Sequence, residues 1–594
     1  AGLLKSTRRK RFNEIQYLPP GKALHVTADQ ATSMKDQVVD LIERSIRAIQ
    51  TEGMLPEGEL PKPQVDHTRD TKHGDLATNV AMVLAKKAGM PPRDLATAII
   101  ERLPQNNVIA QSDIAGPGFI NFHISQASNV TIIKTILTAG EEYGRSNEGQ
   151  GKRVQVEFVS ANPTGPLHVG HGRGAAIGDA LCRLLDNAGW SVHREFYYND
   201  AGQQISNLAL SVKARIDGVE PGDTAWPADG YRGAYIKDVA AAYQNKQTVN
   251  AADRTVTASG DPADAANIQA FSVAWLRREQ DEDLKAFDVN FDCYFLESSL
   301  YTSNAVEETV ETLINNQFTY EQDSALWLRT TDFGDDKDRV MRKREGGYTY
   351  FVPDVAYHHN KWDRGFERVI NEQGADHHST ITRVRAGLQG LKVDIPEGWP
   401  EYVLHQMVTV MRDGEEVKLS KRAGSYVTLR DLIDWVGRDA TRYFLTARAA
   451  TSQLTFDIDL ALSKSNENPV YYIQYAHARI CSVQRKALEQ FGQWTATDGI
   501  PHLELLNSSE EQSLALVLSK YPEVLAGATK RLEPHAVANY LRDVAAGFHS
   551  FYNGHKIMEA NEEISLARLA LVSATQQVIA SGLRILGVSA PEAM

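Results

Sequence analysis

An apolar run that leads through a Pro/Gly loop into a helical pattern constrains the fold more than any other part of the chain. Residues 154–158 read Val-Gln-Val-Glu-Phe, which predicts a buried β-strand. A loop with Pro163 and Gly165 follows, and residues 172–185 then have the apolar spacing of a helix. Because helix N-termini present unpaired N–H groups, this order of elements is typical of a phosphate cradle.

Two histidines lie at the start of the predicted helix. His168 and His171 are three residues apart and share one helical face, and Gly170 between them lets a base or a sugar approach the backbone. A triphosphate bound at this helix start would lie against both imidazoles. The plainer interpretation is that the histidines only satisfy local hydrogen bonds at the end of the helix. This motif alone does not decide between the two.

A lysine-rich loop far downstream supports the nucleotide interpretation. Residues 417–424 read Val-Lys-Leu-Ser-Lys-Arg-Ala-Gly, which places Lys418 and Lys421 on a short segment that ends in glycine. Nucleotidyl transfer needs positive charge where negative charge develops, and mobile lysines supply it. In this order and separation, the two stretches resemble the HIGH and KMSKS signatures of class I aminoacyl-tRNA synthetases. Leu419 replaces the Met of KMSKS and Arg422 replaces its last Ser.

Length and composition set wider limits. A chain of 594 residues with 42% hydrophobic and 23% charged residues is expected to form several globular domains. Its 63 Lys and Arg against 76 Asp and Glu give a net charge of −13, so a nucleic-acid partner would need local basic patches. We find no apolar run of about eighteen residues, and therefore expect no membrane span.

The cysteines are few and far apart. Cys182, Cys293 and Cys481 predict neither a disulfide framework nor a structural zinc site, and they fit a cytoplasmic protein. Residues 1–33 contain several Lys and Arg but no apolar core, so they do not predict a secretory signal. The first convincing helical pattern opens at Met34. We expect residues 1–33 to be a disordered or upstream extension, with an Arg-rich transit peptide as the alternative.

The strand and helix of residues 154–185 begin an α/β fold. A second apolar strand at 192–198 follows, and a strand–helix–strand order implies a right-handed crossover in a doubly wound, Rossmann-type sheet. Residues from about 205 to 290 break the alternation and are expected to form an insertion. We place the catalytic domain at 151–460, with its KMSKS-like loop at 418–422. Three more strands are expected, at 327–329, 348–352 and 368–370.

A small α/β unit is predicted before the catalytic domain, at residues 34–150. Residues 73–81 (His-Gly-Asp-Leu-Ala-Thr-Asn-Val-Ala) and 118–122 (Gly-Phe-Ile-Asn-Phe) resemble the N-terminal domain of arginyl-tRNA synthetases. From about residue 34 onward, the whole chain resembles a bacterial arginyl-tRNA synthetase. The resemblance implies a domain that meets the tRNA elbow, and the alternative is a plain packing domain. The expected elements are helices at 34–50, 76–88 and 93–103 and a strand at 116–124.

The last part of the chain, residues 461–594, is expected to form an all-α bundle. Asn468 and Pro469 are a good N-cap and first-turn pair for a helix. The run Tyr-Ile-Gln-Tyr-Ala-His-Ala-Arg that ends at Arg479 resembles the helical anticodon-binding domain of the same family. Further helices are expected at 510–528, 534–552 and 564–586.

The resemblance implies tRNA contacts within this bundle. It assigns them to Tyr475, Tyr552 and Met594. Aromatic side chains beside basic groups can stack on splayed anticodon bases. The alternative is that the tyrosines are ordinary core aromatics.

The family also implies a reaction, the ATP-dependent attachment of L-arginine to its cognate tRNA through an arginyl-adenylate. The implied partners are ATP with Mg²⁺, L-arginine and the tRNA for arginine, and we expect a monomer with no membrane contact and no structural zinc. Catalysis is assigned to His168, His171, Lys418 and Lys421. Lys421 is the expected principal lysine for the transition state.

ATP binding is assigned to Gly170, Gly374, Asp376, His378 and Ser420. The segment Gly-Ala-Asp-His-His that ends at His378 follows a predicted strand, where a carboxylate can bind ribose hydroxyls. The alternative for this segment is a polar loop without a ligand.

A guanidinium substrate requires buried carboxylates, because it is planar, permanently charged and best bound by two parallel hydrogen bonds. The family pattern assigns arginine binding to Glu157 and Asn162 near the HIGH stretch and to Tyr350 and Asp354 at the end of a later strand. A charge at Glu157, within so apolar a strand, would be costly without a cation. The alternative is that Glu157 faces solvent.

Three other classes were weighed against this assignment. A stand-alone nucleotidyltransferase would not need the helical bundle, a cysteinyl-type enzyme would need zinc-binding cysteines, and a non-catalytic relative should have lost signature residues. One departure matters within the family. Members with a degraded KMSKS loop carry a lysine just before HIGH, whereas this chain has Gly165 in that stretch. Positive charge at the phosphates is therefore expected to come from the loop lysines.

Overall fold

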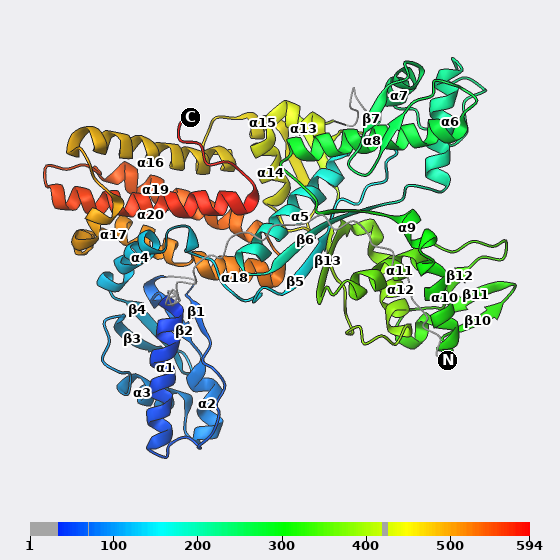
Figure 1. Ribbon diagram of the computed structural model, residues 1–594. Coiled ribbons are helices and arrows are strands. Elements are labelled where there is room, and N and C mark those ends of the chain that lie inside the picture. The colour runs from blue at the N-terminus through cyan, green and yellow to red at the C-terminus, as the bar shows by residue number, and fades with distance from the viewer. Residues whose placement is uncertain (1–33, 69–70, 418–425) are drawn as a thin grey trace, which may run out of the picture. The chain divides into compact units, whose positions relative to one another are not determined.

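The computed structural model describes residues 34–68, 71–417 and 426–594, which all belong to one unit, Ser33–Met594 (Figure 1). The predicted extension at 1–33 and the predicted loop residues Lys418, Ser420 and Lys421 lie outside the described residues. The account below therefore concerns the rest of the chain.

A five-stranded parallel sheet forms the centre of the catalytic half. Its strand order is β14-β13-β5-β6-β9, with β5 in the middle and every neighbouring pair parallel. This topology confirms the predicted doubly wound α/β fold. The sequence patterns did not reveal β9 and β14, which are only four and five residues long. The strands are β5 (Arg153–Glu157), β6 (Ser191–Tyr198), β9 (Cys293–Leu296), β13 (Arg368–Gly374) and β14 (Glu401–His405).

Side chains of β5 alternate between two covered faces of this sheet. Val154 and Val156 belong to a hydrophobic cluster that includes Leu181 of helix α5 (Val169–Asn187). Glu157 lies on the opposite face, where Lys361 of helix α11 (Phe351–Asp363) bonds to it. Helices cover both faces, as a doubly wound sheet requires.

Two blocks of chain interrupt the sheet. The first lies between β6 and β9, and the second, which the sequence patterns did not reveal, lies between β9 and β13. The first contains α6 (Gln203–Ile216), α7 (Tyr235–Gln244), the hairpin of β7 (Thr248–Asn250) with β8 (Thr255–Thr257), and α8 (Ala265–Ala286). The second contains α9 (Glu297–Thr302), α10 (Ala305–Asn315), the antiparallel strands β10 (Thr319–Gln322), β11 (Ala325–Leu328) and β12 (Arg339–Arg342), and α11.

The prediction of a strand at 348–352 is wrong. Helix α11 begins at Phe351, and Tyr350 is its N-cap residue. The run Tyr-Thr-Tyr-Phe-Val is rich in β-formers, but Pro353 follows it, and proline fits the first turn of a helix because the N–H that it lacks would be unpaired there. The predicted strand at 327–329 overlaps β11, which belongs to the small antiparallel sheet rather than to the parallel one.

Two predicted helices also need correction. Residues 76–78 form β2 (Leu76–Thr78), which pairs with β4, so the helix predicted from 76 is α2 (Val80–Ala88). The helix predicted at 510–528 is two helices, α17 (Ser509–Ser519) and α18 (Tyr521–Arg531). Pro522 lies in the first turn of α18 and disfavours helical geometry in the residue before it, which explains the break.

The chain between β14 and the bundle forms a further small sheet with short helices. Its strand order is β16-β15-β17, and the β15–β17 pair is parallel. The elements are α12 (His378–Gly390) before β14, and then β15 (Val408–Arg412), β16 (Glu415–Glu416), α13 (Leu429–Val436), α14 (Arg438–Thr446), β17 (Leu454–Asp457) and α15 (Ile458–Leu462).

The N-terminal unit is a four-stranded antiparallel sheet with three helices, and helix α4 (Gln126–Ala139) follows it. The strand order is β1-β2-β4-β3. Asn129 of α4 donates a hydrogen bond to the backbone of Gln512 in the bundle, at 2.8 Å. The other elements are α1 (Met34–Thr51), β1 (Val65–His67), α3 (Pro92–Glu101), β3 (Ile109–Ala115) and β4 (Phe119–Ile124).

Five helices form the C-terminal bundle: α16 (Pro469–Phe491), α17, α18, α19 (His535–Gly554) and α20 (Glu562–Leu586). Helix α20 contacts both α16 and α19 (Figure 1). It is long and apolar enough to cross a membrane, but 72% of its most apolar window is buried within the protein, as in the central helix of a bundle.

Buried Arg442 of α14 connects the catalytic helix α5 with the end of α20. It forms an ion pair with Asp179 of α5 and donates to the carbonyl oxygen of Leu586 at 3.0 Å. The next residue, Gly587, ends α20 in the left-handed conformation, with φ of 67°. A Cβ at Gly587 would collide with the Arg442 guanidinium. Glycine is therefore needed here both for backbone geometry and for space.

We expect Gly587→Ala to destabilise the protein more than a matched glycine change. Gly89 ends α2 with φ of 64°, and an added Cβ there meets nothing within 4 Å. Gly89→Ala should cost about 1 kcal/mol, the usual penalty for a left-handed alanine. Gly587→Ala should cost at least about 2 kcal/mol more, because the buried ion pair must also shift. Urea unfolding of both variants measures this, and equal losses would contradict the close packing at Arg442.

Candidate active site

Helix α5 begins with a reciprocal hydrogen-bonded cap built from the two predicted histidines. His168 is the N-cap, and its Nδ1 accepts from the His171 N–H at 3.2 Å, while His171 Nδ1 accepts from the His168 N–H at 3.3 Å. Their rings stack with centroids 3.6 Å apart. At Gly170, a Cβ would lie 2.8 Å from the His168 ring, so this glycine gives room to the imidazole. The plainer interpretation of the motif is therefore correct for both Nδ1 atoms.

Both imidazoles are neutral and present their other nitrogen as a donor. Burial, with nearby His405, lowers the pKa of His168 to about 4, and burial with His168 and His405 lowers the pKa of His171 well below its usual value. Because each Nδ1 accepts a backbone N–H, the ring proton of each neutral imidazole is on Nε2. The pair can therefore donate hydrogen bonds to phosphate oxygens without adding fixed positive charge.

The described end of the lysine-loop stretch pairs directly with this helix start. The Val169 N–H donates to the carbonyl of Val427 at 3.1 Å, and the Leu429 N–H donates to the carbonyl of Leu167 at 2.8 Å. Tyr426 contacts the His168 ring edge-on, with centroids 5.9 Å apart. Two segments far apart in the sequence thus meet at the predicted nucleotide site.

A cavity of about 1400 Å³ opens at the carboxyl ends of the strands, where doubly wound sheets bind ligands. Among the predicted residues, His378 does not line it; His378 is exposed at the start of α12, whereas His377 and Thr380 do line it. The predicted residues that line it are Glu157, Asn162, His168, Gly170, His171, Tyr350, Asp354, Gly374 and Asp376.

The polar residues of the cavity wall differ in how firmly they are held. Asn162 donates to Gln204 at 2.8 Å and accepts from the Asn199 N–H at 3.1 Å, so its amide is oriented by two contacts. Asp376 lies just after β13, is exposed, and is free to turn toward a ligand. Tyr350 is 82% exposed at the rim.

One end of the cavity gathers carboxylates. Burial, with Glu157 and Glu297 nearby, raises the pKa of Asp354 to about 7. Burial also raises the pKa of Glu297, which accepts a hydrogen bond from the Tyr197 hydroxyl at 2.8 Å. Raised carboxyl pKa values mark a site that becomes more favourable when a cation arrives. Glu297 was missed by the sequence analysis because it follows β9, a strand that the analysis did not predict.

Glu157 is already paired, which corrects the expectation that a ligand alone would neutralise it. Its Oε2 accepts from Lys361 Nζ at 2.5 Å, and its Oε1 accepts from Ser160 Oγ at 2.9 Å. Lys361 is fully buried and also donates to Asn371 at 3.0 Å. The argument that Glu157 needs a cation was sound, but α11 supplies it. A guanidinium would therefore have to share Glu157 with Lys361.

The turn after β5 is strained. Val159 has φ of 68° and Ser160 has φ of 41°, and a β-branched residue rarely adopts this conformation. Ser160 Oγ donates to Glu157 and accepts from the Tyr197 N–H at 3.2 Å, so two contacts hold the turn. The strained turn directs the chain toward Asn162 and the cavity.

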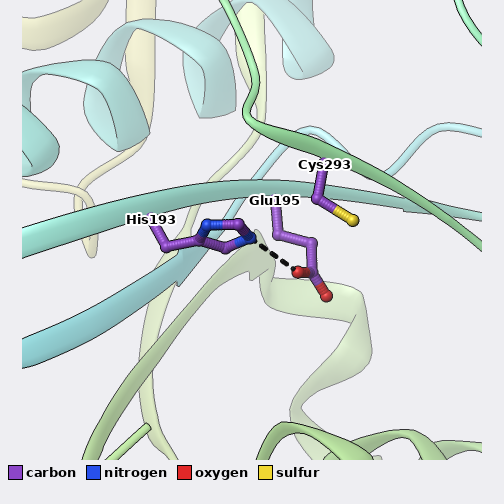
Figure 2. Close-up of side chains that lie close together, drawn as sticks. All are labelled: His193, Glu195 and Cys293. Atoms are coloured by element: carbon purple, nitrogen blue, oxygen red, sulfur yellow. Dashed lines mark hydrogen bonds and ion pairs between the residues drawn. The ribbon is translucent and has the colours of Figure 1, made fainter. Parts of the chain in front are cut away.

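Three potential metal ligands lie together on neighbouring strands (Figure 2). His193 and Glu195 are on β6, and Cys293 faces Glu195 across β9. Arg364 donates to both oxygens of Glu195, at 2.7 and 2.8 Å. Burial raises the pKa of Cys293 to about 12, so its thiol is neutral and a poor ligand. This cluster is better explained as a buried ion pair than as a metal site.

The predicted tRNA-contacting tyrosines form a half-buried stack around an arginine. The Arg479 guanidinium lies over Tyr475 at 4.6 Å and over Tyr552 at 4.5 Å, and it donates to the Tyr475 hydroxyl at 2.8 Å. Tyr471 stacks on Tyr475 with centroids 5.8 Å apart. Met594 is 56% exposed. Aromatic faces beside a cation are suited to unpaired bases.

Comparisons with known proteins agree with this architecture. The family of class I (R) tRNA synthetase catalytic domains matches residues 132–453. The arginyl-tRNA synthetase N-terminal domain matches residues 36–124, and the DALR anticodon binding domain matches residues 473–594. An arginine–tRNA ligase from Geotalea uraniireducens is 58% identical over 562 residues, which cover 94% of this chain and all of the relative.

The chain belongs to the arginyl-tRNA synthetase family. A second relative, the arginine–tRNA ligase of Geobacter metallireducens, is 58% identical over 563 residues, again 94% of this chain and 100% of that protein. The crystal structure of Thermus thermophilus arginyl-tRNA synthetase superimposes with a TM-score of 0.71 at 21% identity, covering 94% of this chain and 100% of that one. At that identity the superposition shows the shared fold alone.

We expect removal of Lys361 to be far more harmful than removal of an exposed lysine from an ion pair. Lys361→Met should destabilise the synthetase by about 3–5 kcal/mol, because Glu157 is left buried and unpaired. Lys152→Met is the matched control, since Lys152 and Glu367 form an exposed pair at 3.4 Å, and its cost should stay below about 1 kcal/mol. Urea unfolding followed by tryptophan fluorescence compares them. A small loss for Lys361→Met would show that Glu157 is protonated or solvated.

Proposed function

We propose that this synthetase attaches L-arginine to its cognate tRNA in two steps at the cavity described above. In the first, a carboxylate oxygen of arginine attacks the α-phosphorus of ATP, and pyrophosphate leaves. In the second, a hydroxyl of the tRNA 3′-terminal ribose attacks the arginyl-adenylate carbonyl, and AMP leaves. Family membership supports the overall reaction, and the carboxylate end of the cavity supports arginine as the amino acid.

The acidic end is the observation that carries the arginine assignment. Asp354 and Glu297 lie in a buried environment that raises the pKa of both, and only a cation would make their ionisation favourable. A guanidinium can accept both carboxylates through its fixed fork of N–H donors. Glu157 holds the far side through Lys361, and Asn162 and Tyr350 complete the arginine subsite.

The histidine end is proposed as the ATP subsite. His168 and His171 donate from Nε2 to phosphate oxygens, Gly170 leaves the approach open, and Gly374 with Asp376 binds the ribose. His377 is a better candidate than His378 for a role at this subsite, since it lines the cavity. Mg²⁺ arrives with ATP and offsets the charge of the triphosphate.

Positive charge at the leaving pyrophosphate is assigned to the loop residues Lys418 and Lys421, with Ser420 beside them. The pairing of Val427 with Val169 supports this assignment, because it anchors the end of that stretch at the helix start. Charge that acts on the transition state lowers the barrier more than it strengthens ATP binding.

The tRNA is proposed to meet the elbow-binding domain at 34–150 and the anticodon-binding bundle at 461–594. In the bundle, Tyr475, Tyr552 and Met594 are the assigned contacts. We further propose a cytoplasmic monomer that needs no structural zinc and no membrane.

The decisive experiment is ATP–pyrophosphate exchange across a panel of amino acids, with and without tRNA, followed by tRNA acylation with the active ones. Arginine alone should support exchange and acylation. Exchange with another amino acid at a comparable rate, or none with any, would overturn the proposed function.

Arginine binding should weaken below neutral pH. Asp354 must ionise to bind a guanidinium, and its pKa without ligand is about 7, so arginine binding releases a proton at lower pH. The dissociation constant of arginine should therefore rise by about tenfold per pH unit well below 7. Calorimetric titration between pH 5.5 and 8, in buffers of different ionisation enthalpy, measures both the affinity and the released proton.

The Asp354→Asn variant provides the control for this pH dependence. It should bind arginine at least about tenfold more weakly at pH 8, as expected for the loss of a charge-assisted pair, and it should lose most of the pH dependence. Neutral citrulline should lose less affinity, while ATP affinity stays within about twofold. Asp363→Asn, at the end of the same helix, should change none of these. Unaltered arginine affinity in Asp354→Asn would remove Asp354 from the site.

A further inference from the structure

A third imidazole lies in the cavity with the two cap histidines. His405 ends β14, and its Nδ1 lies 2.6 Å from Oε1 of Glu372 on β13. Their side chains are 12% and 1% exposed. Both residues line the cavity together with His168 and His171. The sequence analysis singled out neither of them.

The pair is wedged under the first turns of α5. A Cβ at Gly174 would lie 2.6 Å from Glu372 Oε2, and that oxygen has no hydrogen-bond partner among the described residues. Buried Arg173, beside Gly174, donates to the carbonyl oxygens of Gln406 at 2.7 Å and of Ala449 at 2.9 Å. These contacts fix the segment that carries His405 against the helix that carries the cap histidines.

The surroundings make His405 the cationic member of the three imidazoles. Burial and Arg173 oppose its charge, but Glu372 and Asp376 outweigh them and raise the pKa of His405 above its usual value. The charge of His405 in turn helps to lower the pKa values of His168 and His171. A single fixed positive charge therefore lies beside two neutral hydrogen-bond donors.

We propose that His405, paired with Glu372, is a third ATP-contacting histidine, whose cationic Nε2–H binds an oxygen of the triphosphate. This inference rests on the proposed function and adds a residue to its ATP subsite. Glu372 acts through His405 and is a positioning residue. A charged donor in a largely water-excluded cavity binds a phosphate more strongly than a neutral imidazole does. The arrangement thus divides the work, since His168 and His171 orient the phosphates while His405 supplies charge.

The first test compares ATP with adenosine as ligands. His405→Gln keeps an amide donor but removes the charge, and it should weaken ATP binding and kcat/KM for ATP by about tenfold. Adenosine, which lacks phosphates, and arginine should bind within about twofold of the wild-type affinity. His359→Gln is the matched control, because His359 pairs with Asp363 at 3.7 Å on α11 and does not line the cavity. Thermal unfolding of each variant separates misfolding from loss of binding.

The second test uses pH. Because the His405 charge is present below its pKa and lost above it, wild-type ATP affinity should fall as the pH rises through that pKa. Glu372→Gln removes the anionic partner, so the fall should begin at a lower pH, and His405→Gln should lack it. NMR titration of the His405 ring in the wild type and in Glu372→Gln assigns the transition. The charged and titratable groups that face His405, namely His168, His171, Arg173 and Asp376, stay in place in both variants.

Two results would overturn the inference. ATP affinity and its pH dependence could remain unaltered in a folded His405→Gln variant, or adenosine could lose as much affinity as ATP, which would place His405 at the nucleoside or give it only a structural role. Either result in an enzyme that still acylates tRNA with arginine leaves the proposed function intact. A wild-type protein that does not acylate tRNA would refute the proposed function instead, and direct ATP titration would still test His405.

Discussion

The central strand β5 has both faces covered, and this constraint organises the catalytic half of the synthetase. Its apolar residues, Val154 and Val156, pack on the side of α5 and support the start of that helix. Glu157 lies on the other side, where water cannot solvate it, so α11 must bring Lys361 to it. The floor of the cavity is thus a neutralised ion pair, and further carboxylates at that end remain available to a cationic ligand.

Charge is separated along the cavity by burial rather than by composition. At one end, burial raises the pKa of Asp354 to about 7 and favours a guanidinium. At the other end, the cap hydrogen bonds and burial keep His168 and His171 neutral, which leaves fixed charge to other groups. A site of this kind can hold a cationic amino acid and an anionic nucleotide a short distance apart without neutralising either subsite.

Sequence patterns predicted elements well where a local signal agreed with the tertiary environment. The strand, loop and helix of residues 154–185 appear as expected because alternation, turn residues and helical spacing all point the same way. Residues 348–352 were misassigned because β-forming side chains precede the proline of a helical first turn. Strands β9 and β14 were missed, and with them Glu297 and His405, because so short an apolar run carries no clear period.

The sequence by itself determined the family, the order of the domains and the chemistry at the start of α5, since these depend on residues adjacent in the chain. Only the tertiary structure decided which charges meet. Glu157 and Lys361 are 204 residues apart, and Glu372 and His405 are 33 apart. Each pair forms because parallel strand register and helix packing place its members on one face of the sheet. No local pattern records that geometry, because the energy of a buried charge depends on neighbours that the fold alone supplies.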